Sequence, residues 1–200
     1  MKNKLKIILK DIIKIIEGPW FVADGALLGL MREGDLLVWD EDIDIYILPE
    51  TKINWDKLPN KYKYHKDYMC MKIYDGQDEI PTENEWLRFI SYKRTLFQYY
   101  GYNRAQLTEA IASDYKTEKI VRQHPNVWVD IIPLVYDDTH NLYRLNNHWN
   151  GIEFWFTPDE CQGMYNNSLG FDIKIPKDPT KVLERIYGPT WEVQDIYHAY

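Results

Sequence analysis

Apolar residues recur at helical spacing in the first part of the chain. Over residues 4–17 they form one stripe, and three lysines lie on the opposite face. This pattern predicts a first helix packed on a sheet, which Gly18-Pro19 ends. A basic helix lying on an anionic membrane surface is the alternative that the pattern leaves open.

The next segment combines a short apolar strand with a glycine-containing helix. The helix is predicted over residues 26–32, with Gly25 and Gly29 breaking the regular structure. Gly34-Asp35 then turns the chain into a strand over residues 38–47, in which apolar and acidic side chains alternate.

The second half of the chain predicts further strands and one more well-marked helix. Strands are expected over residues 68–76, 126–134, 154–156 and 171–175. Asp178-Pro179 is typical of a helix start, and Gly188-Pro189 is typical of its end. These elements predict a single α+β domain over residues 1–200.

The middle of the chain is less regular. Thr82 and Glu85 have the spacing of a capping box, which predicts that a helix starts there. Residues 86–104 fit a helix and strands equally well, so the pattern leaves their structure open.

The strand over residues 38–47, VWDEDIDIYI, carries three acids on one face. Asp40, Asp42 and Asp44 alternate with apolar residues, and same-face neighbours along a strand lie about 7 Å apart. No Lys or Arg lies between them, so the carboxylates repel one another and raise one another's pKa. Either this face lies in water, or a divalent cation binds it; oxygen ligands of this kind suit Mg²⁺ or Mn²⁺.

A further acid lies inside an apolar run. Asp130 occupies the middle of VWVDIIPL, where an unpaired buried carboxylate would be costly. It is either a structural residue bonded to backbone amides or an arginine, or the third acid of a metal site. An acid on one strand beside an acidic pair on its neighbour is what a two-metal phosphoryl-transfer site requires.

The segment DGALLG precedes the acidic strand. A glycine turn running into a helix N-terminus can bind an anion through its backbone amides, here at Gly25 and Ala26. Arg32 offers a planar set of donors to a phosphate group. A purely structural turn is the alternative.

Composition narrows the classes of function. A formal net charge of −7 argues against general nucleic-acid binding through a basic surface. Cys70 and Cys161 are too few and too far apart for a zinc cluster, and two free thiols in a reducing compartment is the simpler interpretation. Charged residues interrupt the apolar N-terminus, and no segment reaches the about 20 apolar residues of a membrane span. We therefore expect a soluble, cytoplasmic protein.

These motifs together resemble the LicD/fukutin family within the nucleotidyltransferase-like fold. The resemblance rests on GALLG, Arg32, WDEDIDI, VDIIPL, FDIKIPKDP and VLERIYGPTW, which span residues 20–191 in the family's order. It implies a mixed β-sheet flanked by helices, with Asp42, Asp44 and Asp130 as metal-binding and catalytic acids. It also implies transfer of a phosphorylated alcohol, such as phosphocholine or ribitol phosphate, from a CDP-activated donor to a glycan acceptor.

The chain departs from the family at one position. The family usually has Thr or Ser where this chain has Ala26, so a hydroxyl that touches phosphate is missing. The two cysteines also exclude the zinc-binding insertion of some animal members. Two other functions stay open: a nucleotidyltransferase that moves a nucleoside monophosphate from a nucleoside triphosphate, and a non-catalytic domain that binds nucleotides or glycans.

Overall fold

The computed structural model describes residues 2–37, 40–66, 70–76, 127–145 and 155–193. Apart from two residues, these belong to one compact unit formed by residues 1–75 and 127–192. The helix predicted from Thr82 and the undecided residues 86–104 lie outside the described residues, as does Trp39.

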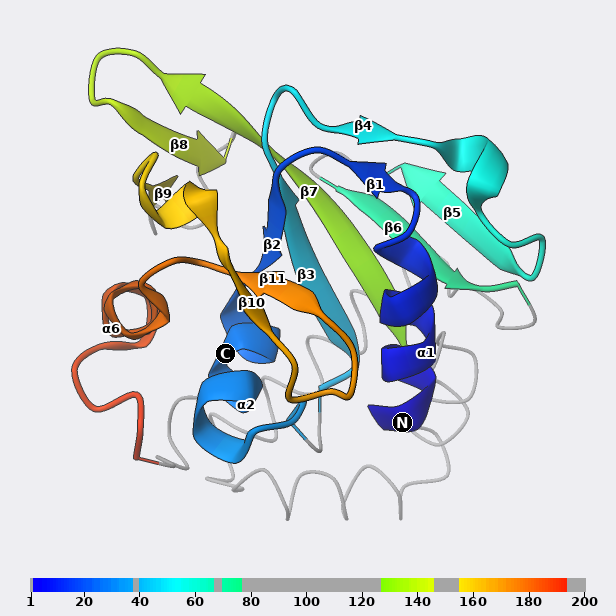
Figure 1. The fold of residues 1–200 in the computed structure, drawn as a ribbon, viewed down its shortest axis with the longest axis horizontal. Coiled ribbons are helices and arrows are strands. Elements are labelled where there is room, and N and C mark those ends of the chain that lie inside the picture. The colour runs from blue at the N-terminus through cyan, green and yellow to red at the C-terminus, as the bar shows by residue number, and fades with distance from the viewer. Residues whose placement is uncertain (1, 38–39, 67–69, 77–126, 146–154, 194–200) are drawn as a thin grey trace, which may run out of the picture. The chain divides into compact units, whose positions relative to one another are not determined.

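A seven-stranded mixed sheet forms the centre of this unit (Figure 1). Five strands follow one another across it, and two more extend it from one end of the central strand. The central pair is parallel, and every other neighbouring pair is antiparallel. In order across the sheet, the five are β2 (Trp20–Val22), β3 (Asp42–Ile47), β7 (Trp128–Asp137), β6 (Met71–Asp75) and β5 (Tyr62–Lys66). The two that extend it are β8 (Leu142–Leu145), which pairs with β7, and β9 (Trp155–Phe156), which pairs with β8.

Helices and short strand pairs complete the described unit. The helices are α1 (Lys2–Ile12), α2 (Asp24–Glu33), α6 (Pro179–Tyr187) and the 3₁₀ turns η1 (Trp55–Lys57) and η2 (Glu160–Gln162). The strand pairs are β1 (Ile16–Glu17) with β4 (Lys52–Ile53), and β10 (Met164–Asn166) with β11 (Ile173–Ile175). A mixed sheet flanked by helices confirms the predicted α+β fold. No helix in the described ranges is both long and apolar enough to span a membrane.

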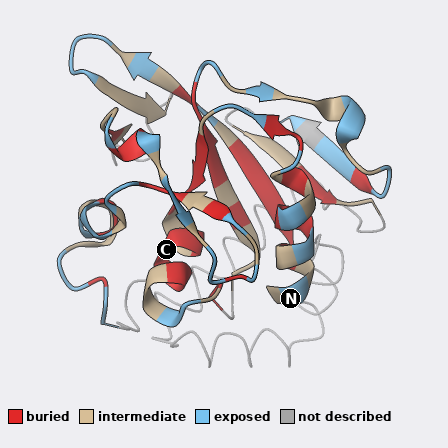
Figure 2. Cartoon of the chain, in the orientation of Figure 1, coloured by how far each residue is buried: buried red, intermediate tan, exposed pale blue. Residues whose placement is uncertain are grey.

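Helix α1 buries its apolar stripe in the protein core. Its stripe residues Leu5, Ile8, Leu9 and Ile12 are at most 1% exposed, and the helix contacts β3 and β7. Ile43 and Ile45 of β3 and Val129 and Ile131 of β7 are fully buried, and Figure 2 shows buried stretches in the central strands of the sheet. The first predicted helix therefore packs on a sheet.

The first helix is shorter than predicted. It ends at Ile12, and Ile16–Glu17 form strand β1 instead of continuing the helix to residue 17. β-branched isoleucines favour strands over helices, and pairing with β4 supplies the hydrogen-bonding partner. That partner lies 37 residues further along the chain (Ile53 opposite Ile16), beyond the reach of a local pattern.

Helix α2 is longer than predicted, and its glycines do not break it. Gly25 and Gly29 both lie inside the helix. A Cβ on Gly29 would lie 2.6 Å from the Asp35 carbonyl oxygen and 2.7 Å from the Leu37 nitrogen, so no larger residue fits there. Gly29 therefore lets the chain fold back closely against the helix before it enters β3.

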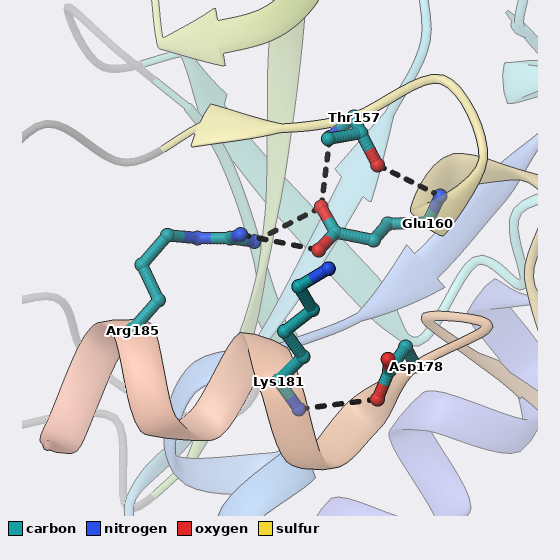
Figure 3. Close-up of polar contacts among 5 residues, drawn as sticks. All are labelled: Thr157, Glu160, Asp178, Lys181 and Arg185. Atoms are coloured by element: carbon teal, nitrogen blue, oxygen red, sulfur yellow. Dashed lines mark hydrogen bonds and ion pairs between the residues drawn. The ribbon is translucent and has the colours of Figure 1, made fainter. Parts of the chain in front are cut away.

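Helix α6 begins and ends as predicted. The Asp178 side chain accepts a hydrogen bond from the Lys181 nitrogen at 3.2 Å, with Pro179 in the first turn (Figure 3). Gly188 follows the last turn and donates to the Glu184 carbonyl. Asp178 is thus an N-cap, which satisfies a backbone donor that the helix itself leaves unpaired.

Candidate functional site

The parallel pairing of β3 with β7 brings the predicted acids together. Asp44 lies opposite Asp130, and Asp42 lies opposite Trp128. Residues opposite each other in neighbouring strands share one face of the sheet, and the isoleucines that alternate with the acids in β3 point to the other face. Asp42, Asp44 and Asp130 each offer one carboxylate oxygen, and these oxygens lie within 4.8 Å of one another.

Asp40 lies beside this cluster but not in the strand. Strand β3 starts at Asp42, so the prediction of a strand from residue 38 was wrong for Asp40. The Asp40 carboxylate packs against the start of α2, where a Cβ on Gly25 would lie 2.6 Å from Asp40 Oδ2. Its charge still acts on the cluster, because it raises the pKa of Asp42 and of Asp44.

Asp42 and Asp44 hold their protons more strongly than an ordinary aspartate does, because the pKa of each is raised. Burial, followed by the charges of Asp40 and Asp130, raises the pKa of Asp42 to about 8. Burial and the charges of Asp42 and Asp24 raise the pKa of Asp44 well above its ordinary value. Negative charges on three crowded carboxylates repel one another, and bound protons relieve that repulsion in the metal-free protein. A hard divalent cation such as Mg²⁺ or Mn²⁺ would relieve it equally well, so these oxygen donors fit such a cation.

Asp130 is the most enclosed member of the cluster. Trp128 Nε1 donates to its Oδ2 at 3.0 Å, and Cys70 Sγ donates to its Oδ1 at 3.3 Å. Lys72 Nζ lies 3.8 Å from Oδ2. A carboxylate has about four lone-pair positions, so an oxygen that accepts one hydrogen bond can also bind a cation. The described contacts of Asp130 come from three side chains: the Trp128 indole, the Cys70 thiol and the Lys72 ammonium.

The predicted phosphate-binding residues do not lie together. Gly25 and Ala26 are in the first turn of α2, and the Ala26 side chain is buried. Arg32 is in the last turn, about 9 Å further along the helix axis at about 1.5 Å per residue. Within the described ranges, Arg32 is partly buried and has no hydrogen-bond or ion-pair partner.

Asp24, the first residue of α2, forms a polar pair with Tyr46, which shares its face of β3 with Asp42 and Asp44. This pair was not predicted from the sequence. Tyr46 Oη donates to Asp24 Oδ2 at 2.6 Å, and burial raises the pKa of Asp24 to about 6. Asp24 has a φ of 51°, in the left-handed region that residues other than glycine rarely adopt. An acid directly before Gly25 was the available signal, but its partner lies 22 residues away.

A buried ion pair fixes α6 to the chain after β9. Arg185 donates to both oxygens of Glu160, at 3.1 and 3.0 Å, and the Thr157 nitrogen donates to Glu160 Oε2 at 2.7 Å (Figure 3). The Arg185 guanidinium also lies 3.9 Å from the ring centroid of Trp155. Phe156, the next residue, packs on Tyr46 with ring centroids 5.3 Å apart. This pair therefore supports the sheet face beside the acids.

The comparison with protein families agrees with this geometry. The model of the LicD/FKTN/FKRP nucleotidyltransferase domain matches residues 18–177, a span that includes both acidic strands. The chain therefore belongs to this family, which indicates a transferase of the phosphotransferase type. No curated protein matches the sequence.

Proposed function

We propose that the protein is a divalent-metal-dependent phosphotransferase that moves a phosphorylated alcohol from a CDP-activated donor to a glycan hydroxyl. The observation that supports this most is the Asp42, Asp44 and Asp130 cluster, whose oxygens lie within 4.8 Å in a chain of the LicD family. Phosphocholine and ribitol phosphate are examples of the group transferred.

In this reaction the acceptor hydroxyl oxygen attacks the phosphorus atom that carries the alcohol. The bond from that phosphorus to the CMP oxygen breaks, CMP leaves, and the hydroxyl proton passes to a carboxylate, Asp44 or Asp130. Asp42, Asp44 and Asp130 would hold Mg²⁺ or Mn²⁺, which when bound neutralises charge on the diphosphate. Backbone amides at Gly25 and Ala26, and the side chain of Arg32, remain the predicted phosphate-binding groups.

A nucleotidyltransferase that moves a nucleoside monophosphate from a triphosphate is the second candidate. The same three acids serve both reactions, and the matching family model describes a nucleotidyltransferase domain. The two reactions differ in the product that leaves: CMP in the first, pyrophosphate in the second.

The test incubates the protein with Mg²⁺ or Mn²⁺, a panel of CDP-alcohols and candidate glycans, and follows CMP by mass spectrometry. We expect CMP release that depends on cation and acceptor and that Asp44→Asn abolishes. Asp56→Asn, an exposed acid on η1, is the matched control and should keep full activity. Pyrophosphate release from nucleoside triphosphates would favour the second candidate, and no turnover with either set would favour a non-catalytic binding domain.

A further inference from the structure

Strand β6 places a lysine in line with two of the acids. Lys72 lies opposite Asp130 on β7, and Asp130 lies opposite Asp44 on β3. Side chains opposite each other share a sheet face, so three neighbouring strands present a cation and two carboxylates in one row. No local sequence pattern marks Lys72, because the row exists only once the three strands pair.

Contacts on both sides hold the Lys72 ammonium at the edge of the acid cluster. Its Nζ lies 3.8 Å from Asp130 Oδ2 and 4.4 Å from the ring centroid of Trp128. Trp128 Nε1 donates to the same oxygen of Asp130, so one indole orients both the acid and the cation. The Lys72 side chain is 23% exposed, so it is not fully enclosed.

The ion pair itself is loose. A distance of 3.8 Å exceeds the about 2.7–3.2 Å of an N–H···O hydrogen bond, so attraction between charges holds Lys72 near Asp130. The described pair between Lys72 and Asp130 is therefore electrostatic and includes no short hydrogen bond. Lysine is a common phosphate-binding residue, acting as a compact point charge.

We propose that Lys72 binds a non-bridging phosphate oxygen of the substrate at the acid cluster, a role that rests on the proposed phosphotransferase function. Arg32, the cation expected from the sequence, has no described contact with the acids, whereas Lys72 lies beside them. A diphosphate that approaches three carboxylates is repelled, and Lys72 supplies a fixed positive charge in the row that it approaches. Lys72 thereby positions the phosphate next to Asp130 and Asp44.

The test measures binding of two probes, CDP and inorganic pyrophosphate, by calorimetry in the presence of Mn²⁺. Lys72→Met keeps a long apolar stem against Trp128 but removes the charge. We expect it to weaken binding of both probes about tenfold or more, the effect of losing a charged hydrogen bond. Mn²⁺ alone should bind as tightly as before or more tightly, because a competing cation has left the cluster. Lys72→Arg should restore most of the probe affinity.

Lys63→Met is the matched control. Lys63 lies on the neighbouring strand β5, is exposed, and pairs with Tyr74 and not with an acid, so its loss should leave all affinities unchanged. Unchanged probe binding in a folded Lys72→Met variant would overturn the proposal, since Lys72 would then only neutralise Asp130. If Lys72→Met does not fold, Lys72→Gln replaces it with the same expected loss.

The two probes separate this inference from the proposed function. If the wild-type protein binds pyrophosphate but not CDP, the donor class is wrong, while loss of pyrophosphate binding in Lys72→Met still supports Lys72 as a phosphate ligand. If the wild-type protein binds Mn²⁺ but neither probe, both proposals fail.

Discussion

Raising the pH of the metal-free protein should lower its free energy of unfolding, and Asp42 should account for one proton of that dependence. The pKa of Asp42 is about 8 in the folded protein, because of burial and the charges of Asp40 and Asp130. Its ordinary value is 3.8. Between these two values the folded protein keeps a proton that the unfolded chain has lost, so each rise in pH favours unfolding.

The size of the effect follows from that one proton. One proton changes the free energy of unfolding by at most about 1.4 kcal/mol per pH unit. Between pH 5 and pH 7 Asp42 alone would thus remove about 3 kcal/mol, a large share of the about 5–15 kcal/mol of a typical domain. The loss is absent below about pH 4, grows up to about pH 8 and is constant above it.

Urea unfolding at fixed pH values in the presence of EDTA measures this slope. Asp42→Asn should show a smaller loss of stability with pH, by up to about 1.4 kcal/mol per unit. Glu184→Gln, an exposed acid on α6, is the matched control and should follow the wild-type curve. Saturating Mn²⁺ should flatten or reverse the wild-type slope, because the cation competes with protons for the same oxygens. Equal slopes in wild type and Asp42→Asn would refute the raised pKa.

Two further substitutions test the supports of the site by urea unfolding. Glu160→Gln breaks the buried pair with Arg185 and should cost about 3–5 kcal/mol, whereas Asp159→Asn, next to it in an exposed ion pair, should cost under about 1 kcal/mol. Equal costs would mean that burial does not matter there. Tyr46→Phe removes the hydroxyl that donates to Asp24. The buried carboxyl then lacks its hydrogen-bond donor, so the free energy of unfolding should fall by about 1–3 kcal/mol. An unchanged stability would show that the pair is not formed.

The sequence predicted the three acids because each belongs to a local pattern. Asp42 and Asp44 alternate with isoleucines, and Asp130 interrupts an apolar run. Both patterns follow from the two-residue period of a strand, which any window of the sequence shows. The parallel pairing that places Asp130 opposite Asp44 joins strands about 86 residues apart (44 to 130), so its register was known only from the structure.

The other charged residues around the acid cluster depend on contacts between distant segments. Lys72 looks like an ordinary strand lysine until β6 pairs with β7. Glu160 and Arg185 lie 25 residues apart, and each resembles a surface charge when considered alone. Pairing between distant segments also explains why the first helix was predicted too long. Residues 16–17 fit the helical stripe, but they pair with β4. Helix α6, by contrast, carries its own start and stop residues, and the sequence predicted it well.

Binding of Mn²⁺ tests the central claim most directly. Electron paramagnetic resonance follows the free cation during titration of the wild-type protein, Asp44→Asn and the control Glu184→Gln. If Asp42, Asp44 and Asp130 hold the cation, the wild-type and control proteins bind Mn²⁺ saturably with equal affinity, and Asp44→Asn binds it about tenfold or more weakly. Equal affinity in Asp44→Asn, or no saturable binding by the wild-type protein, would contradict a metal centre at these three carboxylates.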